Sequence, residues 1–217
     1  MIKAVIFDFD GLILDTETAW YESYRKTLLR NYKFDLPLRE FVKCVGADDT
    51  YLFNYLRQEL GDSFESNKTR EHASILHAEK VKTAEAREGV EQYLEDASKA
   101  GLKIALATSS KREWAVTHLT NLNLIHYFDH IISQDDVKQI KPAPDLFLKA
   151  LEKLHMDASE ALVFEDSLNG LFAAQKAALK TIIIPNPVTE GLAFENYHLK
   201  LTSMEEMSLQ EIIETIA

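Results

Sequence analysis

The 217-residue chain has a single cysteine, Cys44, and no long apolar run. One cysteine excludes an intramolecular disulfide and a cysteine-ligated metal cluster. No apolar stretch reaches the roughly 18 residues that a membrane-spanning helix needs. The N-terminal residues, MIKAVIFDFDGLILD, are interrupted by acids and lack the small-residue cleavage site of a signal peptide. We therefore expect a cytoplasmic protein with no membrane partner.

Positive charge is also scarce. Lysine and arginine number 24 against 35 acids, which gives a net charge of −11. A surface this acidic repels a phosphate backbone, so nucleic acid is excluded as a partner. The apolar fraction of 46% is ordinary for a globular protein. A chain of this length allows one large domain, or a core domain that carries a smaller insertion.

Short apolar runs of strand length alternate with helical patterns along much of the chain. Several runs are apolar at successive positions, which is typical of strands buried on both faces. Repeated strand–helix–strand order predicts an α/β fold, a Rossmann-like parallel sheet with helices on both faces. The predicted strands are residues 2–7, 102–107, 130–133, 161–164 and 181–184.

Residues 16–82 break this alternation. They show helical periodicity but no convincing strand, and they separate the first two strands by far more than an ordinary crossover. We predict a helical cap inserted after the first strand. The predicted domains are therefore a catalytic core, residues 1–15 and 83–217, and a cap, residues 16–82.

Polar residues follow four of the predicted strands at their carboxyl ends. In open parallel sheets these ends form the usual ligand site. Four successive strands therefore bring carboxylates, hydroxyls and one lysine to the same edge of the sheet. The set comprises Asp8, Asp10, Thr108, Ser109, Lys141, Glu165 and Asp166.

The chemistry of this set points to phosphoryl transfer. Crowded carboxylates repel one another unless a cation lies among them, and hard oxygen ligands without imidazole or thiolate favour Mg²⁺. Aspartate is a covalent nucleophile in some phosphoryl transfers, and a lysine supplies charge for the transferring oxygens. These arguments do not decide which aspartate is the nucleophile and which is the acid and base.

The same residues carry a family resemblance. The stretch DFDGLILDT at residues 8–16 resembles the first motif of the haloacid dehalogenase superfamily. Thr108-Ser109 resembles the second motif, KPAPD at 141–145 the third, and VFEDSLNG at 163–170 the fourth. The match covers residues 1 to about 185 in the right order, and four motifs together are highly specific. The chain is most similar in kind to the subgroup of beta-phosphoglucomutase and its sugar-phosphatase relatives.

The resemblance implies an enzyme, an Mg²⁺-dependent phosphatase, and assigns the two catalytic aspartates. Asp8 becomes the nucleophile that forms an aspartyl-phosphate, and it also binds the metal. Asp10 becomes the residue that protonates the leaving oxygen and then activates water, while its backbone carbonyl binds the metal.

The remaining motif residues receive binding roles from the same resemblance. Thr108, Ser109 and Lys141 hold the phosphoryl group. Asp166 ligates Mg²⁺, and Glu165 does so directly or through water. The expected partner is a small phosphorylated metabolite such as a sugar phosphate, and no feature indicates an obligate protein partner.

Two departures from the mutase pattern bear on the reaction. Trp20 stands where mutases carry a cap histidine, and Asp49 stands where a Gly-x-x-Arg motif places an arginine. An acid is a poor partner for a second phosphate, so the sequence favours hydrolysis over phosphomutase activity, the alternative. A phospho-acceptor receiver domain is a further alternative. It is disfavoured because such domains lack a helical insertion and place their aspartate after a middle strand.

Overall fold

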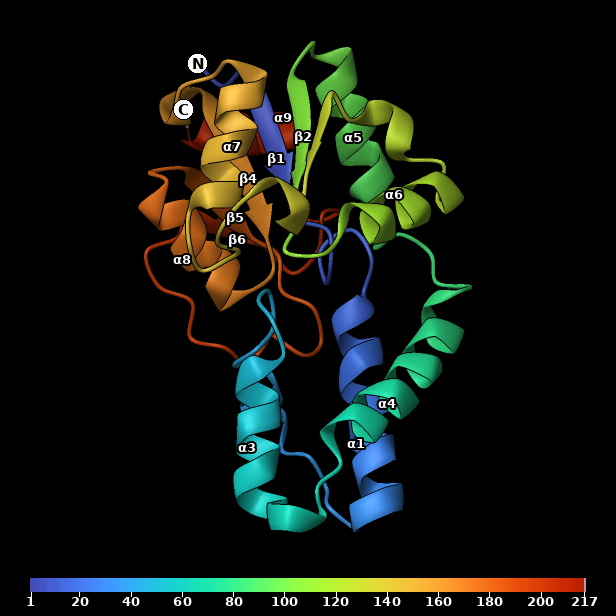
Figure 1. The fold of residues 1–217 in the computed structure, drawn as a ribbon. Coiled ribbons are helices and arrows are strands. Elements are labelled where there is room, and N and C mark those ends of the chain that lie inside the picture. Colours follow the sequence, from blue (N-terminus) through green and yellow to red (C-terminus); the bar gives the residue numbers. More distant parts are fainter. Residues whose placement is uncertain (217) are drawn as a thin grey trace.

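The structure, a computed structural model, describes residues 1–216. A six-stranded parallel sheet with the strand order β3-β2-β1-β4-β5-β6 lies at its centre (Figure 1). The predicted fold class is confirmed, and the five predicted strands all form. The two-residue strand β6 at the sheet edge was not predicted. The strands are β1 (Ala4–Phe7), β2 (Lys103–Ala107), β3 (His130–Ile132), β4 (Ala161–Glu165), β5 (Lys180–Ile183) and β6 (Leu199–Lys200).

Helices cover both faces of the sheet. Side chains alternate across a strand, so Val5 and Phe7 of β1 point to one face while Ala4 and Ile6 point to the other. The first face packs against α5 (Val90–Lys99), α6 (Arg112–Asn121) and α9 (Leu209–Ile216). The second face packs against α7 (Asp145–Leu154) and α8 (Leu168–Lys176). Short 3₁₀ turns occupy Ile125–Tyr127, Gln134–Asp136 and Ala158–Glu160.

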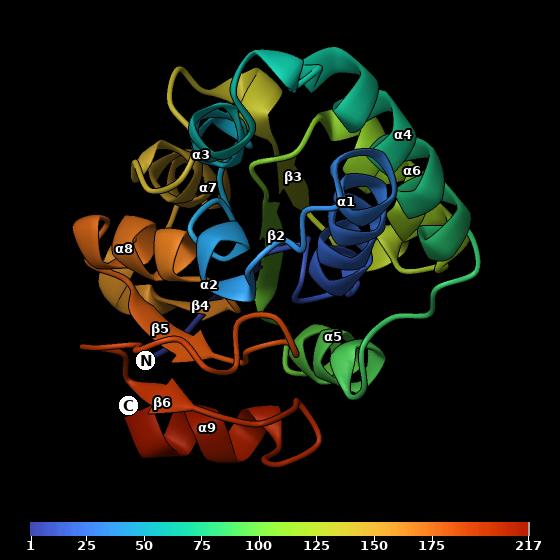
Figure 2. The same cartoon turned by 90° about the horizontal axis from the view of Figure 1, so that it is seen from below.

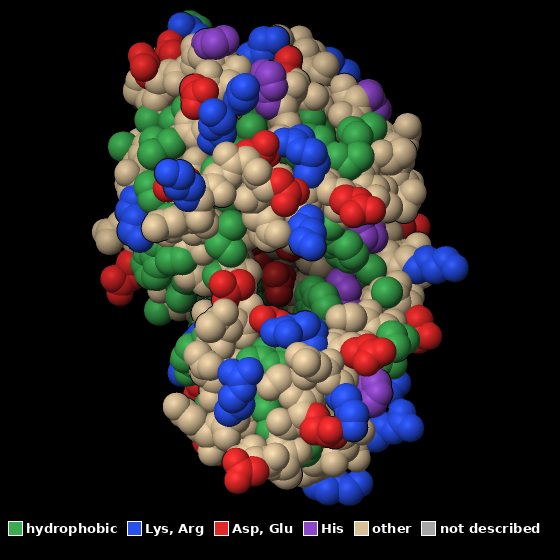
Figure 3. Space-filling view, viewed as in Figure 1, with side chains coloured by type: hydrophobic (Ala, Val, Ile, Leu, Met, Phe, Trp, Pro, Cys, Tyr) green, Lys and Arg blue, Asp and Glu red, His purple; other side chains and the backbone are tan. Residues whose placement is uncertain are grey.

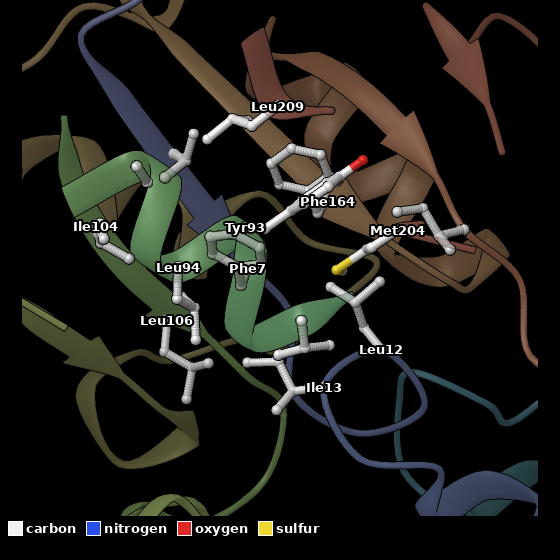
Figure 4. Packing of buried hydrophobic residues seen from close by; sticks show 14 of the residues in the cluster. Phe7, Leu12, Ile13, Tyr93, Leu94, Ile104, Leu106, Phe164, Met204 and Leu209 are labelled. Atoms are coloured by element: carbon white, nitrogen blue, oxygen red, sulfur yellow. The ribbon is translucent and has the colours of Figure 1, made fainter. Parts of the chain in front are cut away.

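Aromatic packing fills the first face directly behind the end of β1. Phe7 stacks on Phe164 of β4 with ring centroids 4.9 Å apart, and Tyr93 of α5 meets Phe164 edge-on at 5.4 Å. Figure 4 shows these three side chains among the aliphatic residues of the same cluster. This tightly packed apolar layer holds the carboxyl ends of β1 and β4 in fixed positions, and it therefore also fixes the positions of the residues that follow these strands.

The residues between β1 and β2 form helices α1 (Thr16–Tyr32), α2 (Leu38–Phe41), α3 (Thr50–Leu60) and α4 (Ser66–Val81), with a 3₁₀ turn at Gly61–Ser63. We call residues 16–81 the helical segment. It lies beyond the end of the sheet, with α1 and α4 side by side (Figures 1 and 2). An apolar cluster of its own holds it together, including Leu28 of α1 and Leu52, Phe53 and Leu56 of α3. No helix within residues 1–216 is long and apolar enough to span a membrane.

Hydrogen bonds and packed rings join the helical segment to the core. Ser109 Oγ donates to the Gly46 carbonyl at 3.0 Å, and Asn169 Nδ2 donates to the Val45 carbonyl at 2.8 Å. Aromatic rings also pack across this boundary. His77 of α4 lies 3.8 Å from the Trp20 ring of α1 and 5.5 Å from the Trp114 ring of α6.

His77 is buried within this stack. The side chain is 2% exposed, and burial lowers its pKa to about 4. The ring is therefore neutral in the folded protein at pH 5, whereas it is mostly protonated in the unfolded chain. The unfolded state takes up the extra proton, so this residue's contribution to folding stability falls as the pH drops from about 6.5 toward 4.

Replacing His77 with phenylalanine tests this linkage. Between pH 7 and pH 5 the wild type should lose about 2 kcal/mol more unfolding free energy than His77→Phe, since one pKa unit corresponds to about 1.4 kcal/mol. Denaturant unfolding at the two pH values measures the difference, and the carboxylates common to both proteins cancel. Parallel pH dependences would mean that His77 titrates normally in the fold.

Candidate active site

The register of the sheet brings the residues after three strands to one place. Phe7 of β1 is level with Leu106 of β2 and with Phe164 of β4. Asp8 therefore follows β1 at the height of Glu165, the last residue of β4. Its backbone N–H donates to the Phe164 carbonyl at 3.1 Å, which extends the ladder by one residue.

A buried lysine links the ends of β1 and β4. Lys141 Nζ donates to Asp8 Oδ1 and, at 2.6 Å, to Glu165 Oε1. Lys141 and Glu165 are at most 1% exposed, and Asp8 is 5% exposed. Burial raises the pKa of Asp8 to about 8, although Lys141 acts in the opposite direction. Burial lowers the pKa of Lys141, but the two carboxylates outweigh it and the net shift is upward.

Asp166 completes a cluster of three buried carboxyl groups. One oxygen each of Asp8, Glu165 and Asp166 lie within 4.8 Å of one another. Asp166 Oδ2 accepts from Asn186 Nδ2 at 2.7 Å, but its buried Oδ1 has no hydrogen-bond partner among the described residues. Burial, followed by the charges of Glu165 and Asp8, raises the pKa of Asp166 well above its usual range.

The cluster has the properties of a hard-cation site. An unpartnered buried carboxylate oxygen is costly in a protein interior, and a divalent cation among the three groups would remove that cost. Gly11 approaches so closely that a Cβ there would lie 2.3 Å from Asp166 Oδ2, and its φ of +88° also favours glycine. The loop after β1 therefore wraps tightly around the carboxylates.

Asp10 is held separately from this cluster, by four donors. Thr16 Oγ1 (3.0 Å) and Trp114 Nε1 (2.9 Å) donate to its Oδ1. Ser110 Oγ (2.7 Å) and Thr108 Oγ1 (3.3 Å) donate to its Oδ2. The two aspartates of the first motif thus differ in environment: Asp8 faces an ammonium and other carboxylates, whereas Asp10 faces neutral donors.

The structure places the hydroxyls after β2 unequally. Thr108 is buried beside Asp10, as its position in the sequence suggests. The Ser109 hydroxyl is turned toward the helical segment, where it donates to Gly46. Ser110, which is not among the predicted site residues, contacts Asp10 instead. All three residues from Thr108 to Ser110 carry a hydroxyl group, and this run was the sequence signal that could have indicated Ser110.

An open cavity of about 480 Å³ lies between the core and the helical segment, and Asp8 and Asp10 line it. Figure 3 shows a hollow at this level of the molecule, with acidic side chains at its rim and in its depth. The helical segment contributes Trp20, Tyr24 and Arg70 to the wall. A larger hollow, about 910 Å³, lies beside Arg87. The Arg87 guanidinium is bound there to three backbone carbonyls, and none of the clustered carboxylates lines that hollow.

Asp49 is not the free acid that the sequence suggested. Arg70 of α4 pairs with it through two hydrogen bonds, Nε to Oδ2 at 2.9 Å and Nη2 to Oδ1 at 3.0 Å. The guanidinium also lies 4.2 Å from the centre of the Phe53 ring. Arg70 offsets the charge of Asp49, so repulsion of a second phosphate by Asp49 is weaker than the sequence argument assumed. Sequence reasoning missed this because the partner lies 21 residues away on another helix.

Glu17 is a second residue of the cavity that sequence reasoning missed. It lies in the first turn of α1, is 9% exposed and lines the cavity with Asp8 and Asp10. Burial, then the charge of Asp10, raises its pKa well above the usual range. Asp15 accepts from Thr18 N at 3.1 Å and caps the same helix, which orients this turn toward the site.

Gly170 gives a test of how tightly the site is packed. A Cβ at Gly170 would lie 1.9 Å from the Glu165 carboxyl carbon, and 2.0 and 2.1 Å from its oxygens. Glycine-to-alanine exchange in a helix ordinarily stabilises by up to about 1 kcal/mol. Here we expect Gly170→Ala to destabilise by about 1–3 kcal/mol, because the new methyl group must displace a buried carboxylate.

Gly191 is the matched control, because nothing lies within 4 Å of a Cβ built there. Gly191→Ala should leave the unfolding free energy within about 0.5 kcal/mol of the wild type. Chemical denaturation compares the two variants. Equal stabilities would show that the Glu165 carboxylate does not occupy this position.

The chain is similar to known proteins of one enzyme family. The model of the haloacid dehalogenase-like hydrolase family matches residues 5–184. YhcW of Bacillus subtilis is 41% identical over 215 residues, covering 99% of this chain and 97% of that protein. The phosphorylated carbohydrates phosphatase of Thermotoga maritima is 34% identical over 190 residues, covering 83% and 84%.

The fold of a solved relative matches over nearly the whole length. The crystal structure of CbbY from Rhodobacter sphaeroides in complex with phosphate superposes with a TM-score of 0.80 at 25% identity. The match covers 98% of this chain and 100% of that one. The prediction of a hydrolytic enzyme is confirmed, and the chain belongs to the haloacid dehalogenase-like hydrolase family.

Proposed function

We propose that the chain is a cytoplasmic, Mg²⁺-dependent phosphatase that hydrolyses a small phosphorylated metabolite through a phosphorylated Asp8. The observation that carries this proposal is the different setting of the two motif-one aspartates. Asp8 lies beside the buried ammonium of Lys141, whereas Asp10 lies among neutral donors. This difference supports Asp8 as the residue that attacks phosphorus and Asp10 as the residue that exchanges protons.

The proposed reaction has two displacements at phosphorus. Asp8 attacks the phosphoryl group, an aspartyl O–P bond forms and the ester P–O bond breaks. Asp10 gives its proton to the leaving oxygen, and the alcohol departs. Asp10 then takes a proton from water, which attacks phosphorus, so that inorganic phosphate leaves and Asp8 is regenerated. The polar partners around Asp10 hold it in place for both proton transfers.

Phosphate binding falls to three residues at the same edge of the sheet. Lys141 supplies positive charge and Thr108 a hydroxyl for the transferring oxygens. Ser109 acts through its backbone N–H, since its hydroxyl is bonded to Gly46. The ammonium is buried, and its charge is therefore poorly screened by solvent.

The carboxylates fit Mg²⁺. Asp8 and Asp166 would ligate it through carboxylate oxygens and Asp10 through its backbone carbonyl, with Glu165 ligating directly or through water. The unpartnered Oδ1 of Asp166 supports this set. Oxygen donors without histidine or cysteine favour Mg²⁺ over softer metals. Bound there, the ion supplies charge that offsets both the carboxylates and the phosphate.

We assign the helical segment as a cap, inserted as residues 16–82 into a core of residues 1–15 and 83–217. It closes one side of the cavity and would select the substrate. Trp20 offers an aromatic face, and Arg70 is already paired with Asp49. The pair leaves no uncommitted arginine on this wall for a second phosphate, whereas carboxylates accept hydrogen bonds from hydroxyls. A sugar phosphate fits this wall better than a bisphosphate, and hydrolysis fits better than phosphomutase activity.

The names of relatives support the same substrate class. The Thermotoga maritima relative is named a phosphatase of phosphorylated carbohydrates, and the CbbY structure contains phosphate.

The two aspartates should fail differently when each is changed to asparagine. Asp8→Asn removes the nucleophile, so turnover of an aryl phosphate should fall below about 1% of the wild type. Asp10→Asn keeps the nucleophile and loses the proton donor and base. A good leaving group should then give a burst of phenol equal to the enzyme concentration, followed by slow turnover. Stopped-flow absorbance separates the two patterns. A burst from Asp8→Asn would contradict the assignment.

Metal binding is measurable without activity. In EDTA at pH 7, Asp166→Asn should unfold at a temperature at least as high as the wild type, because the raised pKa of Asp166 means that its charge costs stability there. Mg²⁺ should raise the unfolding temperature of the wild type and restore turnover lost in EDTA, and it should do neither for Asp166→Asn. Asp62→Asn, at the exposed tip of the helical segment, is the control and should behave as the wild type. Full turnover in EDTA would overturn the metal assignment.

A further inference from the structure

The four donors around Asp10 are not equivalent. Thr16, Thr108 and Ser110 offer hydroxyl groups, which rotate and can either donate or accept a hydrogen bond. Trp114 offers an indole N–H, which can only donate. Of these four partners, the indole is therefore the one that cannot change from donating a hydrogen bond to Asp10 to accepting one from it.

We propose that Trp114 is a positioning residue for Asp10, and that the rings stacked on it make this hydrogen bond depend on the helical segment. The inference rests on the proposed function, because it concerns the residue that delivers a proton to the leaving oxygen. With its N–H on Oδ1, Trp114 orients the carboxyl group so that Oδ2 lies against Thr108 and Ser110, the side of the proposed phosphate site.

Packing holds the indole in this orientation. His118, one turn further along α6, lies 4.0 Å from the Trp114 ring, and His77 of α4 lies 5.5 Å away on the side of the helical segment. His77 itself stacks on Trp20 of α1 at 3.8 Å with an interplanar angle of 11°. A shift of α1 and α4 relative to the sheet would move these rings first.

The rings of Trp20, His77 and Trp114 thus connect the position of the helical segment over the cavity with protonation of the leaving group by Asp10. Trp20 belongs to the cavity wall of the helical segment, and Trp114 to the wall of the core. When the two walls are in contact through His77, Trp114 is held against Asp10. When they separate, the indole loses its support and Asp10 loses its fixed donor. Efficient protonation of the leaving group then requires the helical segment in place over the cavity.

Trp114→Phe keeps an aromatic ring, although a smaller one, and removes the N–H donor. We expect the rate of the first displacement, measured in the first turnover, to fall about tenfold for an alkyl phosphate, a poor leaving group. This is a part of the 10²–10⁴-fold that general acid catalysis provides. For an aryl phosphate with a good leaving group the rate of this step should change less than threefold, because that oxygen needs little protonation. The substrate concentration that gives half of the maximal first-turnover rate should stay the same for both, since Thr108 and Lys141 are untouched.

Tyr93→Phe is the matched control. It also removes one hydrogen-bond donor from a packed aromatic ring, since Tyr93 OH donates to the Met207 carbonyl, but it lies in the core cluster away from Asp10. Its rate of the first displacement should equal the wild-type value for both substrates. If Trp114→Phe lowers the rate of the first displacement equally for the two leaving groups, or lowers neither, Trp114 does not position Asp10.

Two variants of His77 test the dependence on α4. His77→Ala removes the ring between Trp20 and Trp114, and it should reproduce the selective loss on the alkyl phosphate. His77→Phe restores a ring and should recover most of that loss. If the ratio of the first-displacement rates for the alkyl and the aryl phosphate is the same in His77→Ala as in the wild type, Trp114 does not depend on the helical segment.

Fluorescence tests the contact without any turnover. The chain has two tryptophans, so Trp20→Phe leaves Trp114 as the single indole emitter. In that background, adding Asp10→Ala should shift the Trp114 emission maximum, because the indole N–H loses its carboxylate partner. An unchanged spectrum would overturn the contact. A shifted spectrum in a protein whose wild type hydrolyses neither phosphate ester would instead refute the proposed function while leaving the contact in place.

Discussion

One buried ammonium group holds the reactive edge of the sheet together. Lys141 lies between Asp8 and Glu165, and all three side chains are almost completely removed from water. Charged groups in such a setting are stable only when they are paired and hydrogen-bonded. With Asp166 nearby, three carboxyl groups share a single ammonium. Burial, and after it the charge of the neighbouring carboxylates, raises the pKa values of Asp8 and Asp166. The excess negative charge also favours a divalent cation at the same place.

The fold brings these charges together through sheet register. Phe7 and Phe164 stack in the layer beneath the site, so Asp8, the residue after β1, lies at the height of Glu165, the last residue of β4. Gly11 and Gly170 then leave no room beside the carboxylates, since a Cβ at either position would overlap them. Backbone packing therefore keeps the acids close together despite their repulsion.

Sequence patterns predicted the sheet and most of the carboxylate edge because both depend on local features. A continuous apolar run predicts a buried strand, and the carboxyl ends of parallel strands meet at one edge, so Asp8, Glu165 and Asp166 were expected together. The pairing of Asp49 with Arg70 was missed, because two residues on different helices meet only in three dimensions. Strand β6 was missed because two residues carry too little pattern.

Trp114 shows a different limit of sequence reasoning. Its helical spacing with Leu119 indicates an ordinary core position, and the ring is indeed packed. Only the structure shows that the indole N–H reaches Asp10 and that His77 of a distant helix lies against the ring. Periodicity indicates which side chains pack against a core, but it does not indicate where a polar atom of a partly buried side chain points.

The proposed mechanism depends on Asp8 carrying the phosphoryl group. Acid quenching of the wild-type enzyme in the first turnover of a phosphate ester, followed by mass spectrometry of its peptides, tests this most directly. We expect a phosphate adduct on the peptide that contains Asp8, on that aspartate and not on Asp10. This adduct should disappear as inorganic phosphate forms. Release of phosphate in the first turnover with no adduct on any peptide would contradict it.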